Sequence, residues 1–198
     1  MYVIVFSNLV MKDYKKFASE YLISEEGHQI IQLLLDGYKD PAVAVNSSMM
    51  LCDCIQQRGI NEYLLDNCAL LEPLFTSYAH SPTFEICSDV FKAISLLLRK
   101  NKSMVKEKLK SSDKLRKCVF GWFEGLINSK EYVCRRMSLQ VGSRGRVVLS
   151  LATQGIPPGQ DELRYYAGIR RKCKEPCSYH DSFANTPSFN PIRGVPCV

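Results

Sequence analysis

Residues 40–55 read Asp40-Pro41-AVAVNSSMMLCDCI, and residues 81–98 read Ser81-Pro82-TFEICSDVFKAISLLL. In each stretch a residue that can cap a helix precedes a proline, and proline at the first helical position loses no hydrogen bond. Each stretch is therefore predicted to open a helix, and the second helix, extending to about Lys100, is predicted to be the longest. The two openings lie 41 residues apart.

The two stretches also share a pattern of apolar residues, which indicates an internal repeat. Counted from the capping residue, the matching positions are Val43, Val45 and Met49 in the first stretch and Phe84, Ile86 and Val90 in the second. A weaker third copy begins at Ser129, with Tyr132 and Cys134 at the first two positions. Periods of about 40 to 47 residues are typical of HEAT and armadillo repeats. Such repeats provide surfaces for other proteins more often than active sites.

The rest of the chain up to Leu139 is predicted to be helical, and no strand pattern of comparable length is present. The other predicted helices cover Asp13–Tyr21, a run from Ser24 as N-cap through Leu35, Asn61–Leu65, Ala69–Tyr78, a run from Ser112 or Asp113 through Ile127, and a last helix from about Lys130. One stripe of side chains is predicted to pack in the core: Met49, Met50, Phe84, Phe91, Trp122 and Phe123. The fold class predicted is all-α, a partial armadillo/HEAT-like helical repeat solenoid.

The composition changes after Leu139. Residues 140–198 contain 6 Gly and 6 Pro, and they carry 8 Lys and Arg against 4 Asp and Glu. Two parts are therefore predicted: residues 1–139 as a helical repeat domain, and residues 140–198 as a Gly/Pro-rich, disordered tail.

The cysteines and the N-terminus indicate an intracellular protein. The nine cysteines are an odd number, and several fall on apolar helix faces, where a free thiol behaves as a small hydrophobe. This pattern favours a reducing compartment over a disulfide framework. The opening segment MYVIVFSNLVM is too short to span a bilayer and lacks the positive region of a signal peptide. We therefore expect a soluble, cytoplasmic protein.

Motifs for catalysis are absent from the sequence, so the chain is not expected to be an enzyme or to need a cofactor. The segment from Arg99 to Lys117 has nine basic residues against Glu107 and Asp113. It is interpreted as a solvated connection between helices, and the alternative is a surface that steers an acidic or phosphorylated partner. The tail contains Cys173-x3-Cys177-x2-His180, which leaves open an alternative function as a zinc- or nucleic-acid-binding module built on this basic tail.

A polar cluster on the last predicted helix is the candidate binding site. Tyr132, Arg136 and Gln140 follow one another at four-residue intervals on one face, and Arg135 lies beside them. An arginine next to an aromatic side chain on a solenoid surface can hold a carboxylate. The alternative is a surface face on which Arg136 is only solvated.

Three segments resemble the calcium-binding protein 39 family, also called mouse protein 25. The run from Gly37 to Ile55 is similar to its G-Y-E-x-P-x-I-A-L-N…M-L-R-x-C-I, Thr83–Phe91 to its T-F-D-I-A-S-D-A-F, and Glu131–Leu139 to its N-Y-V-T-K-R-Q-S-L. Order and spacing match as well, so the resemblance covers roughly residues 17–139.

The resemblance implies an armadillo-like rod without catalysis, which binds sterile-20-type kinases and the pseudokinase adaptor of liver kinase B and holds them in the active conformation. We therefore expect a scaffold that binds a kinase or pseudokinase through the concave face of its helical rod. It implies a pocket for a C-terminal Trp-Glu-Phe motif, in which Arg136 matches the family's arginine and Tyr132 its tyrosine, whereas Gln140 replaces its lysine. Neither a small-molecule substrate, a membrane nor nucleic acid is expected as the partner of such a rod. The resemblance also implies more helices before Phe17 and more repeats after Leu139, so the chain is interpreted as a truncated, alternatively spliced or mispredicted product.

Overall fold

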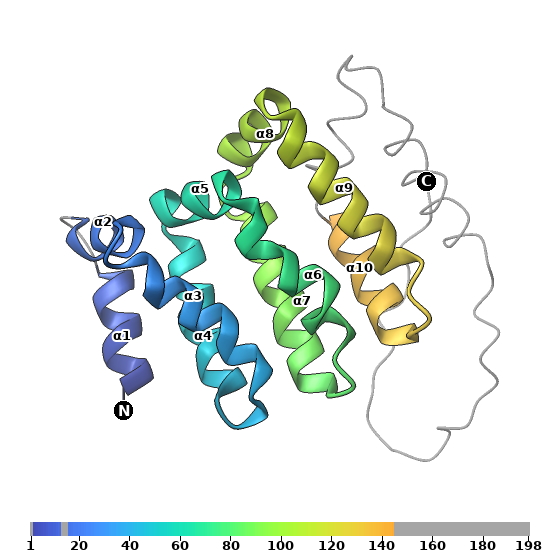
Figure 1. Cartoon of the computed structure of the whole chain (residues 1–198), viewed down its shortest axis with the longest axis horizontal. Coiled ribbons are helices and arrows are strands. Elements are labelled where there is room, and N and C mark those ends of the chain that lie inside the picture. The colour runs from blue at the N-terminus through green and yellow to red at the C-terminus, as the bar shows by residue number, and fades with distance from the viewer. Residues whose placement is uncertain (1, 13–15, 145–198) are drawn as a thin grey trace.

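The computed structural model of the chain describes residues 2–12 and 16–144, and the regular secondary structure of this part consists of helices, without strands (Figure 1). The predicted all-α class is therefore confirmed. The helices are α1 (Tyr2–Met11), α2 (Phe17–Ile23), α3 (His28–Asp36), α4 (Pro41–Gln56), α5 (Arg58–Asp66), α6 (Glu72–Thr76), α7 (Phe84–Arg99), α8 (Lys102–Ser111), α9 (Asp113–Ile127) and α10 (Tyr132–Arg144), with short 3-10 turns η1 (Gly37–Lys39), η2 (Cys68–Leu71) and η3 (Tyr78–His80).

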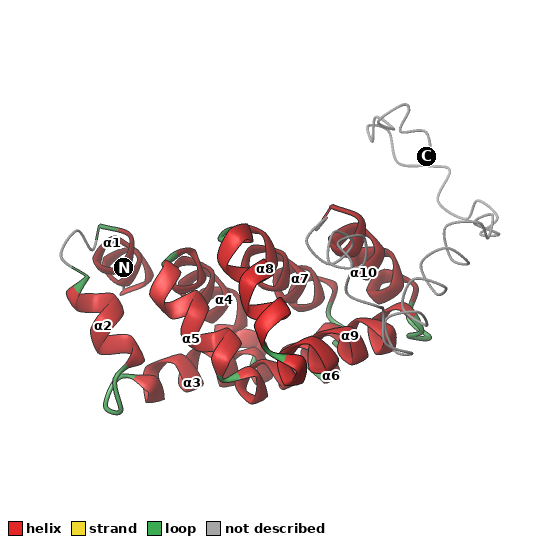
Figure 2. Cartoon of the chain, turned by 90° about the horizontal axis from the view of Figure 1, so that it is seen from above, coloured by secondary structure: helices red, strands yellow, loops and turns green. Residues whose placement is uncertain are grey.

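The helices after α1 form three consecutive three-helix units, α2–α3–α4, α5–α6–α7 and α8–α9–α10. Equivalent helices of successive units pack against each other: α4 on α7 and α7 on α10, α6 on α9, and α2 on α5 and α5 on α8. Helix α1 packs on α4 as the third helix of a preceding unit would. Figure 2 shows α1, α4, α7 and α10 as one layer, and α3, α6 and α9 form a second layer along one side of it. This is the stacking of an armadillo-like helical repeat array.

The internal repeat is real, but its register differs from the one predicted. The three third helices bury side chains at equivalent positions in three sets: Ala44, Cys87 and Cys134; Ser48, Phe91 and Ser138; Leu51, Ile94 and Val141. The spacing is thus 43 residues between α4 and α7 and 47 between α7 and α10. The 41-residue register pairs exposed Val45 with buried Ile86, so it aligned opposite faces of the two helices.

The caps explain this difference in register. The Asp40 carboxylate accepts a hydrogen bond from Ala42 N at 2.9 Å, which confirms the predicted opening of α4. Ser81 was expected to cap α7 in the same way. Its hydroxyl accepts from Thr83 N at 3.3 Å, but the helix itself begins at Phe84 with Thr83 as N-cap. The two openings therefore differ by two residues.

Two other predicted helix starts had different outcomes. The Ser112 hydroxyl accepts from Leu115 N at 3.2 Å and opens α9 as predicted. Ser24, the predicted N-cap of the next helix, instead closes a turn: its hydroxyl donates to Tyr21 O and accepts from Gly27 N. A Cβ at Gly27 would lie 1.9 Å from Tyr21 O, so this turn requires glycine and α3 begins only at His28.

The basic segment and the last helix also differ from the prediction. Residues 102–111 were interpreted as a connection, but they form α8, which buries Met104, Val105 and Leu109. The last helix continues past Leu139 to Arg144. The predicted tail, with its cysteine and histidine motif, lies beyond residue 144 and so outside the described residues.

Cysteines take part in the core as the sequence predicted. All six cysteines of the described part are free thiols, and five of them are buried. Cys87 and Cys134, at equivalent positions, each donate to a carbonyl eight residues earlier, Ala79 O at 3.2 Å and Leu126 O at 3.8 Å. Burial raises the pKa of Cys134 to about 11. In both units, the buried thiol of the third helix thus contacts the segment that precedes that helix in the same unit.

Candidate partner-binding face

The face of the α4–α7–α10 layer that points away from α3, α6 and α9 is the candidate surface, and three of the four predicted site residues, Tyr132, Arg136 and Gln140, are assigned to it. Helices α4 and α7 are covered on both sides by neighbours of their own layer and on a third side by the second layer, so their exposed mid-helix side chains point to the remaining free side. Helix α10 is the last helix of the described part and has only α7 beside it in this layer, and its side chains that line a groove with α7 lie at the edge of the same surface. We call this surface the layer face. The exposed or partly exposed residues that carry the site on it are Val45 and Met49 of α4, Phe84, Ser88 and Lys92 of α7, and Tyr132, Arg136 and Gln140 of α10.

Tyr132 and Arg136 form a pair on α10. The Arg136 guanidinium donates to the Tyr132 hydroxyl at 3.3 Å, and both residues are exposed. The four-residue spacing places the two side chains one helical turn apart on the same side. The pairing holds the guanidinium on the layer face, where it is available to an anionic group of a partner.

Arg135 points elsewhere, although it is adjacent in sequence. Its guanidinium donates to the carbonyl oxygens of Ser129, at 2.7 Å, and Lys130, at 2.9 Å. These carbonyls belong to the loop that follows the end of α9. Arg135 therefore ties the α9–α10 loop to α10.

Gln140 lies in a groove between α7 and α10. The groove has a volume of about 200 Å³ and is lined by Ser88, Phe91, Lys92, Ser95 and Arg99 of α7 and by Met137, Gln140 and Val141 of α10. Helices α7 and α10 run in the same direction and start on the same side of the array (Figure 1). Arg136 therefore lies one turn closer to the start of α10 than Gln140 does. The structure thus brings the groove and the Tyr132–Arg136 pair onto neighbouring turns of α10.

Exposed apolar residues on this face are functional candidates that the sequence reasoning missed. Phe84 is 63% exposed and Met49 is 47% exposed, so the prediction that both pack in the core was wrong. Phe91 and Phe123 of the same predicted stripe are buried, while Met50 and Trp122 are half-buried against the core. Phe84 occupies the first turn of α7, one turn before Ser88 of the groove. In the sequence, only the position of Phe84 on the outward side of the first turn of α7 could have indicated that this side chain is exposed.

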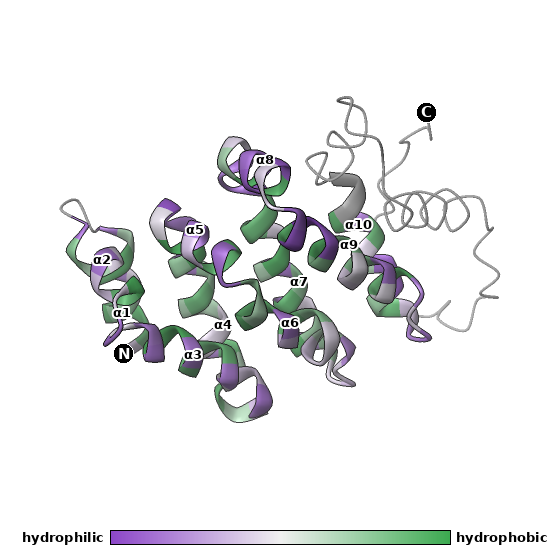
Figure 3. Ribbon diagram, turned by 45° about the horizontal axis from the view of Figure 1, so that its top comes forward, coloured by the Kyte–Doolittle hydropathy of each residue, from purple (hydrophilic) through white to green (hydrophobic). Residues whose placement is uncertain are grey.

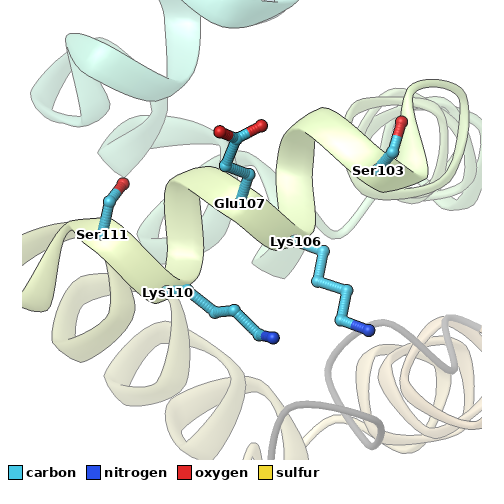
Figure 4. Close-up of a pocket in the computed structure, with 5 residues that line it drawn as sticks. All are labelled: Ser103, Lys106, Glu107, Lys110 and Ser111. Carbon is cyan, nitrogen blue, oxygen red and sulfur yellow. The ribbon is translucent and has the colours of Figure 1, made fainter.

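A second surface hollow, on α8, is a weaker candidate. It is lined by Ser103, Lys106, Glu107, Lys110 and Ser111, all from one helix (Figure 4). Lys106 and Lys110 extend to one side of α8, and Glu107 extends to the other. The helix is largely hydrophilic on its outside (Figure 3). No buried apolar side chain lines the hollow, so it offers a partner charge without an apolar anchor.

Other kinds of site have no support in the described part of the chain. Among residues 2–12 and 16–144, no three His, Cys, Asp or Glu side chains gather closely enough to hold a metal ion. None of the helices described there combines the length and the apolar character needed to cross a membrane.

The stacked three-helix units and their exposed layer face define an armadillo-like helical repeat protein. The chain belongs to the Mo25-like family, whose sequence model matches residues 1–142. The resemblance seen in the sequence is thereby confirmed, and the match continues to the last turn of α10.

Relatives of the chain carry names from this family. It is 31% identical over 119 residues to mouse "Calcium-binding protein 39-like", covering 60% of this chain and 34% of that protein. It is 29% identical over 140 residues to "MO25-like protein 2" of Caenorhabditis elegans, covering 69% of this chain and 39% of that protein. A third relative, the "Degreening-related gene dee76 protein" of Auxenochlorella protothecoides, is 29% identical over 133 residues, 67% of this chain and 39% of that protein. The chain therefore spans less than half the length of these relatives.

Proposed function

We propose that this protein is a non-catalytic scaffold that binds a protein kinase or pseudokinase through the layer face of α4, α7 and α10. The observation that carries the proposal is the exposed Tyr132–Arg136 pair. The resemblance in the sequence matches these two residues to the tyrosine and the arginine of the family motif. Neighbouring exposed apolar side chains add the hydrophobic contacts that a protein interface needs.

The chemistry of the face supports a protein partner. Phe84 and Met49 offer apolar area to a docking surface, and Arg136 offers a charge-assisted hydrogen bond to a carboxylate. Exposed aromatic and arginine side chains are the types that contribute most to binding energy at interfaces. The proposed partners are a sterile-20-type kinase domain, the pseudokinase adaptor of liver kinase B, and the C-terminal Trp-Glu-Phe motif. Activation of the bound kinase in the cytoplasm is the proposed outcome.

A pull-down of the full chain with a sterile-20-type kinase domain and with a Trp-Glu-Phe peptide tests this proposal. Wild-type chain is expected to bind at least one of the two, and Tyr132→Ala with Arg136→Ala is expected to weaken binding about tenfold or more. Arg58→Ala is the matched control, because Arg58 is an exposed arginine at the start of α5. A folded wild-type chain that binds neither partner would refute the proposal.

Kinase activation is measured separately, by adding the chain in excess to the purified kinase domain and following substrate phosphorylation. Increased turnover is expected with the wild-type chain, and no increase with the Tyr132→Ala, Arg136→Ala variant. Binding without any increase in turnover would restrict the proposal to a scaffold that does not activate.

A further inference from the structure

We propose that the groove between α7 and α10 is a binding subsite for an acidic peptide segment, in which Lys92 and Arg99 hold a carboxylate and the groove floor holds an adjacent apolar side chain. This inference rests on the proposed function, partner binding on the layer face, and it names the chemistry that the partner presents there. Lys92 and Arg99 were not among the site residues predicted from the sequence.

The charge of the groove comes entirely from α7. Ser88, Lys92, Ser95 and Arg99 follow one another at intervals of four, three and four residues, so they form a single line along the helix. Two of these four side chains are cations, and no carboxylate lines the groove. Over seven residues the helix rises by about 10 Å, so one extended peptide segment can reach both cations.

Both cations remain available to a ligand. Lys92 is exposed, and no salt bridge of Lys92 or Arg99 occurs among residues 2–12 and 16–144. The Arg99 guanidinium donates to the Ser95 hydroxyl at 3.4 Å, which is a neutral partner within the same line. By contrast, Lys108 and Lys117 on the neighbouring helices are already paired with carboxylates.

The floor of the groove is apolar. Phe91 and Val141 are buried, and Met137 packs half-buried against the core. With a volume of about 200 Å³, the groove is smaller than the roughly 300–1,000 Å³ typical of small-molecule sites. It therefore fits one or two side chains of a peptide better than a metabolite.

The cations of the groove lie beside α10 as well as on α7. Gln140 lines the groove together with Lys92, which projects from the neighbouring helix. In this protein the anion-binding charge near position 140 is thus supplied by α7.

An acidic peptide fits the groove better than nucleic acid does. Single-stranded nucleic acid binds through aromatic side chains on which bases stack. The aromatic residue of the groove, Phe91, is buried in its floor with 1% of its surface exposed. A carboxylate beside an apolar side chain instead matches both the cations and the floor.

Titration of the 15N-labelled full chain with the peptide acetyl-Leu-Glu-Leu-Glu-Leu-amide, followed by NMR, tests this inference. We expect the largest shifts at backbone amides of the groove, around Ser88, Lys92 and Gln140. The peptide with Gln in place of both Glu, and the Lys92→Gln, Arg99→Gln variant with the original peptide, are each expected to bind about tenfold more weakly. Raising the salt concentration is expected to reduce the difference between the two peptides.

The matched control is Lys102→Gln with Lys106→Gln, which removes the same charge from α8 and is expected to leave the affinity unchanged. Dispersed amide spectra of all variants establish that they are folded. Shifts centred on α8, equal affinity for the Glu and Gln peptides, or unchanged binding by the Lys92→Gln, Arg99→Gln variant would each overturn the inference. Shifts caused equally by an oligonucleotide or by anionic vesicles would overturn it too.

Failure here is distinguishable from failure of the proposed function. Kinase binding by a chain that shows no peptide shifts at the groove would reject the subsite and keep the scaffold. Peptide binding at the groove by a chain that captures no kinase domain and no Trp-Glu-Phe peptide would keep the subsite and reject the scaffold proposal.

Discussion

At the residue scale, neighbouring or similar residues have different tasks that depend on what surrounds them. Asp40 and Ser81 each precede a proline, yet only Asp40 caps its helix, because α7 begins two residues after Pro82. Arg135 and Arg136 are adjacent, yet one ties down a loop and the other lies on the layer face.

The caps give the first prediction. Asp40→Ala is expected to lower the free energy of unfolding by about 1 kcal/mol, because Ala42 N at the start of α4 loses its acceptor. Ser81→Ala serves as the control and should cost less than half of that, since its bond closes a turn outside the helix. Urea unfolding followed by circular dichroism gives both values. Equal losses would contradict the assignment of Asp40 as the functional cap.

The two arginines give the second prediction. Arg135→Ala is expected to lower the free energy of unfolding by about 1 kcal/mol, because the carbonyls of Ser129 and Lys130 lose a charged donor. Arg136→Ala is expected to change stability by less than about 0.5 kcal/mol, since its bond lies on an exposed surface, and to weaken partner binding. Urea unfolding combined with the pull-down separates the two roles. A stability loss confined to Arg136→Ala would reverse this assignment.

At the element scale, α8 shows how tertiary contacts decide whether a basic segment becomes a helix. Its sequence has many lysines, which is why it was interpreted as a connection. In the fold, Met104, Val105 and Leu109 are buried, and Lys108 reaches across to α5. The Lys108 ammonium lies 3.0 Å from Glu62 and 2.8 Å from Asp66, so α8 is held on α5 by charge as well as by apolar packing.

This ion-pair network gives the third prediction. Asp66 and, after it, Glu62 raise the pKa of Lys108 above its usual 10.5. A group whose pKa is raised on folding stabilises the fold below its unfolded pKa and loses that contribution as pH rises through its folded pKa. Lys108→Met is therefore expected to cost about 1 kcal/mol at pH 7, and the difference from wild type should shrink above about pH 10.5.

Urea unfolding of wild type and Lys108→Met at pH 7 and pH 11 measures this effect. The control is Lys102→Met, an exposed lysine of the same helix that should change stability by less than about 0.5 kcal/mol at either pH. A wild-type advantage over Lys108→Met that is the same at both pH values would show that the ammonium charge is not the cause.

At the scale of the whole molecule, the units are joined by buried side chains that repeat from helix to helix. Two of these, Cys87 and Cys134, are cysteines, and the burial of five cysteines in the described part has a consequence for the pH dependence of the entire fold. Desolvation raises the pKa of Cys54 to about 12 and that of Cys134 to about 11, compared with 9.0 for a free thiol. The unfolded chain therefore loses these protons at lower pH than the folded chain does.

The fourth prediction follows from these thiols. Because their pKa values are raised on folding, stability is complete below about pH 9 and falls as pH rises toward 11–12. Between its unfolded and its folded pKa, each such thiol lowers the free energy of unfolding by about 1.4 kcal/mol for every unit by which the pH rises. Urea midpoints between pH 7 and pH 11 should show the decline, and Cys54→Ala should make it shallower even though the variant is less stable at pH 7. Parallel curves for the two proteins would contradict this account.

Much of the fold could be predicted from the sequence, but less of the candidate site could. The helical repeat, the caps at Asp40 and Ser112, and the family motif around Arg136 depend on local patterns that a single segment carries. The exposure of Phe84 and the position of Lys92 beside Gln140 depend on which helices pack together, so no local pattern contains them.

The amino-acid sequence by itself determined that this protein is a stack of helices of the Mo25-like family, because capping and helical periodicity act within a few residues. Only the tertiary structure decided the 43- and 47-residue registers, the different directions of Arg135 and Arg136, and the cationic groove between α7 and α10. The physical reason is that the registers and the groove depend on neighbours about 45 residues away along the chain, which meet only when the repeats stack. The direction of Arg135 depends instead on the path of the loop five and six residues before it, which brings two carbonyl oxygens to its guanidinium.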